Sequence, residues 1–158
     1  MKNTFKRSGA ALISLVLLLV LAVSAGAASS QNVGVKFWKE RSDKESMANS
    51  GIDPDRTATL TRQANGTYTL TLPIKQVSKL GVTGYLSGLT IGDVIYNGTL
   101  TGDFNKATAV LTIKNLPASV LTGSDVNKSV LVTCNIQMDL QVLGEINTSA
   151  RMCIWNQK

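Results

Sequence analysis

After residue 28 the chain consists of short segments in which every second residue is apolar. Residues 33–38 and 67–72 are examples, and turn-forming residues separate such segments from one another. A period of two places alternate side chains on one face of an extended strand. Asn65-Gly66 precedes the second example and is typical of a hairpin turn, because both residues tolerate a positive φ. This pattern restricts the chain to an all-β fold.

The alternating segments predict about eight strands in a single domain spanning residues 29–158. The abundance of Thr, Val and Ile in them suits a pleated, half-buried surface. Strands of this length and spacing are typical of an immunoglobulin-like sandwich or a Greek-key barrel, and we expect the sandwich. The expected strands are 33–38, 57–63, 67–72, 83–91, 94–101, 106–113, 129–139 and 150–156.

One segment departs from the alternation and predicts a short helical turn after the first strand. Ser42 and Glu45 have the spacing of a capping box, in which each side chain bonds to the backbone of the other. Gly51 can end the turn in the left-handed conformation. We expect this turn to lie at one end of the sandwich, where it can roof a groove.

The N-terminal residues have the pattern of a secretory signal peptide. A basic start (residues 1–7) is followed by an apolar stretch (about 10–23) and by small residues that include Ala25 and Ala27. Small residues in an A-x-A pattern mark a cleavage site. We therefore expect residues 1–28 to be removed and the domain to be secreted or displayed on the extracellular cell surface.

The alternative is an uncleaved membrane anchor. The whole apolar block is just long enough to span a bilayer, which takes ~20 residues. In that case the leader would be the protein's one contact with a membrane. The cluster of small residues favours cleavage, because it has no purpose in an anchor.

Charge and composition argue against two classes of function. The formal net charge of +6 includes Lys2, Lys6 and Arg7 of the leader, and the remaining basic residues are scattered, so nucleic-acid binding is not expected. The chain has 0 His, which removes imidazole bases, Ser-His and Cys-His nucleophiles and imidazole metal sites. We expect neither an enzyme nor a metal-ion site.

The two cysteines can be placed if residues 129–139 and 150–156 form a hairpin. With Leu143-Gly144 at its centre, Cys134 faces Cys153. A cross-strand disulfide is then predicted, since exported proteins mature in an oxidising compartment. Two buried thiols are the open alternative.

The same register predicts which residues of the last strand face outward. It places Ala150, Met152 and Ile154 on the side away from the core. An outward Met-x-Ile pair requires a cover, which could be a neighbouring loop or an apolar ligand.

Several segments, in order, resemble a known family. Val35–Trp38 leads into the turn Ser46-Met47-Ala48-Asn49, Leu80–Leu86 contains Gly-x-Thr-Gly-Tyr-Leu, and Ala150–Trp155 forms an Ala-Arg-x-x-Ile-x-Trp type of run. The arrangement resembles the NEAT (near-iron-transporter) domain, and more closely the NEAT-like modules of Gram-positive surface proteins. The likeness covers most of residues 33–156.

This resemblance implies an eight-stranded immunoglobulin-like sandwich on a bacterial cell surface. In haem-binding members the haem lies between the short helix after the first strand and the last hairpin. The first tyrosine of a Tyr-x-x-x-Tyr motif at the start of the final strand holds the iron. Here the corresponding segment, residues 146–151, contains no tyrosine, which excludes the usual ligand.

Methionine could replace the missing tyrosine. Thioethers serve as axial haem ligands, and related surface haem carriers use two methionines. Met47 and Met152 would flank the site that the resemblance implies, so the candidate haem-binding residues are Ser46, Met47, Met152 and Ile154. The alternative is that both methionines only fill gaps in the packing.

The predicted function is therefore a secreted or cell-surface, non-catalytic binding module. Its expected cofactor is haem, and its expected partners are haem, a haem protein or proteins of the cell envelope. The alternative is a structural or adhesive module with no small ligand. An open, apolar groove between residues 42–51 and 139–151 favours the first function, and a packed end favours the second.

Overall fold

The computed structural model describes residues 28–79, 81–139 and 144–158. The expected signal peptide, apart from its last residue, and Leu143 of the expected hairpin centre lie outside these ranges, so cleavage of the leader stays a prediction. Within the described ranges, no helix combines the length and the apolar character needed to cross a membrane.

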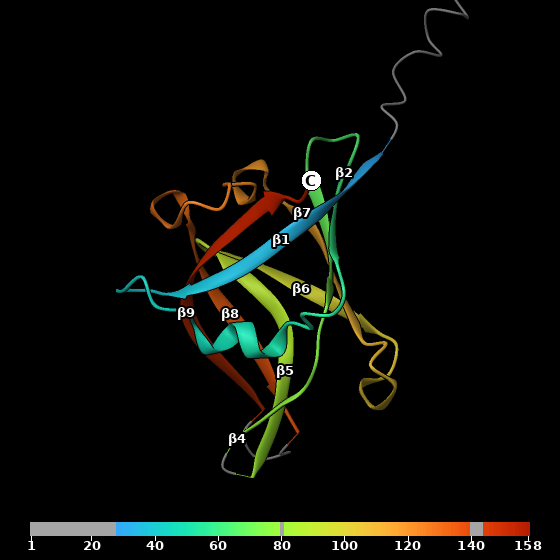
Figure 1. The fold of residues 1–158 in the computed structure, drawn as a ribbon, viewed down its shortest axis with the longest axis vertical. Helices are drawn as coiled ribbons and strands as arrows, with labels where there is room; N and C mark the ends of the chain where they lie inside the picture. The colour runs from blue at the N-terminus through green and yellow to red at the C-terminus, as the bar shows by residue number, and fades with distance from the viewer. Residues whose placement is uncertain (1–27, 80, 140–143) are drawn as a thin grey trace, which may run out of the picture.

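The predicted all-β class is confirmed. Among the described residues, a nine-stranded antiparallel sheet runs in the order β4-β5-β6-β7-β3-β2-β1-β9-β8, and an additional pairing of β5 with β8 brings its two ends together (Figure 1). The strands are β1 (Ser29–Lys39), β2 (Ala58–Arg62), β3 (Tyr68–Pro73), β4 (Val77–Lys79), β5 (Val82–Ile91), β6 (Val94–Thr101), β7 (Val110–Leu116), β8 (Val130–Met138) and β9 (Glu145–Asn156).

The alternation in the sequence correctly identifies the core face of most strands. Val33 and Phe37 of β1 and Leu70 and Leu72 of β3 are buried. Threonines alternate with the buried residues of β2 and β3 and pair across the strands, as Thr59 does with Thr71. Most of the buried apolar side chains among the described residues form a cluster inside the closed sheet.

Several stretches differ from the sequence-based expectation, among them the first strand, which begins at Ser29 instead of residue 33. The sequence analysis missed β4, which is only three residues long. The expected strand at 106–113 is shifted to β7, because residues before it form the 3-10 helix η2 (Phe104–Lys106), which ends with Ala107 in the left-handed conformation. The last strand also begins earlier, at Glu145.

The short helical turn after the first strand is confirmed, but its predicted capping box is wrong. The helix is η1 (Met47–Gly51), and its N-cap is Ser46, whose Oγ accepts a hydrogen bond from Ala48 N at 3.3 Å. The residues between the end of β1 and Ser46 form a tight turn. Lys39 N closes this turn by donating a hydrogen bond to Lys44 O at 2.8 Å. Two further 3-10 helices, η3 (Ala118–Val120) and η4 (Val126–Lys128), lie between β7 and β8.

The register of β9 against β8 differs from the predicted register by an odd number of residues. Cys134 pairs with Thr148, and Val130 pairs with Met152. Because successive side chains of a strand point to opposite faces, an odd shift turns the whole strand over. Ala150, Met152 and Ile154 are therefore buried, and the prediction that they face outward is wrong.

The predicted disulfide between Cys134 and Cys153 is also wrong: both cysteines are buried free thiols. Cys134 belongs to the hydrophobic core cluster. Cys153 is on the opposite face of the sheet, where its Sγ lies 3.6 Å from the carbonyl oxygen of Asp125 next to η4. Side chains on opposite faces cannot form a cross-strand bridge, because their Cβ atoms point apart.

We predict that the purified protein keeps both thiols reduced and unreactive while folded. Burial raises the pKa of the Cys134 thiol to about 12, so the reactive thiolate is scarce at neutral pH. The thiol reagent DTNB at pH 8 should label neither cysteine in native protein and both in urea without reductant. A reductant should leave the melting temperature unchanged. Absence of free thiols in urea would show that a disulfide forms.

Candidate functional site

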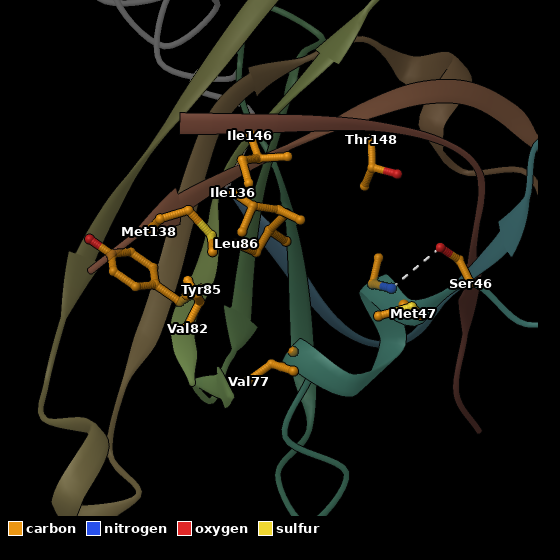
Figure 2. Close-up of a pocket in the computed structure, with 13 residues that line it drawn as sticks. Ser46, Met47, Val77, Val82, Tyr85, Leu86, Ile136, Met138, Ile146 and Thr148 are labelled. Atoms are coloured by element: carbon orange, nitrogen blue, oxygen red, sulfur yellow. Dashed lines mark hydrogen bonds between the residues drawn. The ribbon is translucent and has the colours of Figure 1, made fainter. Parts of the chain in front are cut away.

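An open pocket lies between η1 and the sheet, with a volume of about 270 Å³. Ser46, Met47, Ala48 and Gly51 form the wall at η1. The opposite wall comes from strands β4, β5, β8 and β9 (Figure 2). The pocket lies in the groove that the sequence analysis expected between residues 42–51 and 139–151.

The Asn49 side chain holds η1 in place. Its Oδ1 accepts a hydrogen bond from Phe37 N at 2.8 Å, and its Nδ2 donates to Phe37 O at 2.7 Å. The amide thus satisfies both backbone polar groups of one β1 residue, as a neighbouring strand would. At the other end of η1, Lys75 N donates to Gly51 O at 2.9 Å. These bonds attach the helix to β1 and to the segment before β4.

The sheet wall is built around Gly84 of β5 and Met138 of β8, both of which line the pocket. A Cβ added at Gly84 would lie 2.7 Å from Met138 Sδ and 3.0 Å from Gln137 O. Such distances are well inside van der Waals contact, so only glycine leaves room for the Met138 sulfur in its present position. Gly84 therefore leaves the space that the Met138 thioether occupies.

Two methionine side chains line the pocket on different sides. Figure 2 shows Met138 beside Tyr85 at one side and Met47 beside Ser46 at the other. Met47 is 59% exposed, which leaves its side chain accessible at the pocket mouth. Thioether sulfur is a polarizable, uncharged donor and a known axial ligand of haem iron.

The pocket walls carry no charged side chain among the described residues. Tyr85 is their one ionisable group; its ring lies 5.1 Å from the Phe104 ring, and its hydroxyl points away from the pocket (Figure 2). The charged residue next to Ser46 in sequence, Glu45, forms an ion pair with Lys36 at 2.5 Å. The pocket therefore offers apolar surface, two thioethers and few hydrogen-bonding groups.

The structure places the predicted site residues in two different locations. Ser46 and Met47 line the pocket, as expected. Met152 and Ile154 are fully buried in the core and contribute nothing to the lining. The reversed orientation of β9 explains this difference, because the strand presents Ile146 and Thr148 to the pocket.

Met138 and Gly84 are the important site residues that sequence reasoning missed. Met138 continues the apolar face of β8 that includes Val132 and Ile136, so its side of the sheet could have been inferred. Its closeness to η1 could not, since this depends on the packing of segments that are far apart in sequence. Gly84 belongs to the Gly-x-Thr-Gly-Tyr-Leu segment on which the family resemblance rests, but that match does not indicate a position in the pocket wall.

The comparisons with known proteins concern the fold. No protein-family profile matches the chain, and no curated protein sequence matches it. Among solved structures, the NEAT5 domain of IsdX2, a B. anthracis hemophore in complex with heme, is 10% identical with a TM-score of 0.53, and the match covers 83% of this chain and 98% of that chain. A mutant of IsdX2-NEAT5, also in complex with heme, gives the same values.

The fold is that of a NEAT domain. The expectation drawn from the short segments of the sequence is thus confirmed for the architecture. In this NEAT fold, η1 is the short helix after the first strand, and β8 and β9 are the last hairpin.

We predict that Asn49→Ala detaches η1 and lowers the stability of the protein. The change removes both side-chain hydrogen bonds to Phe37 and takes away the Asn49 acceptor of Phe37 N, while Phe37 O still accepts from Ser46 N, at a cost of about 1–3 kcal/mol. Thermal and urea unfolding measure this cost. Asn65→Ala is a suitable control, because Asn65 bonds only within an exposed turn. Equal effects of the two changes would contradict the anchoring role.

We predict that Gly84→Ala destabilises the protein by about 1–3 kcal/mol through overpacking. A second change, Met138→Ala, should recover part of the loss in the Gly84→Ala background, since it removes the closest contact. In the wild-type background Met138→Ala should itself be destabilising. A double-mutant cycle of urea unfolding measures the coupling, and additive effects would contradict the contact.

Proposed function

We propose that this protein is an exported, non-catalytic haem-binding module and that haem binds in the pocket between η1 and the β8–β9 hairpin. The observation that carries the proposal is the open, uncharged pocket at this position of a NEAT fold. A solved domain of similar fold is itself in complex with heme. Export rests on the predicted signal peptide at residues 1–28.

The residues present fit a porphyrin in their chemistry. Ile136 and Leu86 offer apolar surface to a flat hydrophobic ring, and a cofactor site needs only a few polar groups beside such walls. Bound haem would supply an iron atom that accepts axial ligands. Ser46, at the N-cap of η1, lines the pocket and keeps its hydroxyl proton available for a polar group of the ligand, since its oxygen accepts from Ala48 N.

Iron ligation requires a donor other than the missing tyrosine. From β9, the pocket receives Ile146 and Thr148, and neither side chain is an established haem ligand. Met47 and Met138 are the donors suited to iron in the described lining, and they would hold the iron if haem binds here. Met138 thus takes the role that the sequence analysis gave to Met152.

The adhesive alternative has less support. It depends on free sheet edges or on a packed end, whereas the end beside η1 is open and apolar. The pairing of β5 with β8 also closes the sheet. Among the described strands, the strand at the end of the order is then β4, which has a partner on one side only. Because β4 is three residues long, it offers only a short free edge for protein contacts.

We predict that adding hemin to the purified protein shifts and sharpens the Soret absorbance band. Met47→Leu and Met138→Leu remove sulfur while preserving apolar volume, so each should weaken hemin binding by about tenfold or more and change the ligand-sensitive visible bands. Both should leave the melting temperature of the ligand-free protein nearly unchanged.

Met152→Leu is the matched control, because it makes the same chemical change in the core, away from the pocket. It should bind hemin as the wild type does. A protein that shows no Soret shift would refute the haem-binding function. If the double variant Met47→Leu/Met138→Leu gives the wild-type spectrum with hemin, the assignment of the methionines as iron ligands is refuted, while haem binding itself stands.

A further inference from the structure

The described lining of the pocket is uncharged, and this affects which oxidation state of haem iron it can accommodate. A porphyrin carries two negative charges on its nitrogens, so the ring with its iron is neutral for Fe(II) and carries one positive charge for Fe(III). Among the described residues, the lining contains no carboxylate that could compensate this charge. Glu45, next in sequence to the η1 wall, is already paired with Lys36.

Electrostatics in an apolar site therefore favours the reduced form. Charge-charge interactions strengthen as water is excluded, and a charge without a partner is costly to desolvate. An anionic axial ligand, such as a phenolate, would neutralise the ferric centre. The thioethers of Met47 and Met138 are neutral and cannot do so.

The chemistry of sulfur acts in the same direction. Thioethers are soft ligands that prefer metal ions in low oxidation states, as their selection of Cu(I) illustrates. In cytochromes, methionine ligation raises the reduction potential of haem iron, which means that the ferrous state is stabilised. Charge and softness are separate properties of the two side chains, and both disfavour Fe(III).

We infer that this site holds ferrous haem more tightly than ferric haem, so that oxidation of the iron loosens the ligand. The inference rests on the proposed haem-binding function and adds to it a dependence on oxidation state. The change is a one-electron reduction of Fe(III) to Fe(II) by an external one-electron reductant, and no protein bond forms or breaks other than the iron–sulfur contacts. By linkage, tighter binding of Fe(II) raises the reduction potential of the bound haem.

The test compares the two oxidation states in the same purified protein. Hemin is titrated in air, and haem reduced with dithionite is titrated without oxygen, each in competition with a haem acceptor of known affinity for that state. We expect the dissociation constant to be lower for the ferrous form by about tenfold or more. Spectroelectrochemistry should independently give a reduction potential above that of free haem.

A change on β9 provides a variant with the opposite expectation. Thr148→Tyr introduces a phenol from the strand that lines the pocket, and an anionic oxygen ligand should shift the preference toward ferric haem. Thr148→Phe adds the same ring without the hydroxyl and controls for bulk. Met152→Leu should keep the wild-type preference.

The outcomes separate the inference from the function on which it rests. If neither oxidation state binds, the haem-binding function fails and the inference fails with it. If both bind with equal affinity, or ferric haem binds more tightly, haem binding stands and the inference is overturned. Equal oxidation-state preferences in Thr148→Tyr and Thr148→Phe would also overturn the ligand-charge argument.

Discussion

The pairing of β9 with β8 determines both the core and the pocket of this protein. In the observed register, Val130 lies opposite Met152 and Ile136 lies opposite Ile146. Because alternate residues share a face, this single relation sends Met152 and Ile154 into the core and Ile146 toward η1. A shift by one residue would exchange the two faces of β9 and expose the core side chains.

The pocket lies between the sheet and η1, which is attached by hydrogen bonds to backbone groups of β1 and of the segment before β4 and which packs Ala48 against the core. The Asn49 amide occupies the polar groups of Phe37, while the Phe37 ring is fully buried inside the sheet. The helix is thereby fixed at one edge and leaves Met47 exposed above the groove.

The chemistry of the site follows from the absence of a tyrosine in residues 146–151 of the last strand. A tyrosine on the last strand would bring an ionisable oxygen, whereas this chain brings two neutral thioethers from η1 and β8. Both are polarizable and flexible, so they can adapt to a flat ligand without carrying charge. Selectivity in such a pocket depends on shape, on softness and on the net charge of the ligand, and these properties are the basis of the proposed preference for ferrous haem.

The sequence by itself determined the all-β class, most strand positions and the presence of a short helical turn, because alternation and turn residues are local properties of neighbouring residues. Through its resemblance to NEAT domains it also predicted that Ser46 and Met47 lie at the site, although it placed the start of the helix at Ser42 instead of Ser46. Only the tertiary structure decided the register of β9, the separation of Cys134 from Cys153 and the presence of Met138 instead of Met152 in the pocket lining. Each depends on how strands distant in sequence align, and an uncertainty of one residue in a loop is enough to reverse a strand's faces.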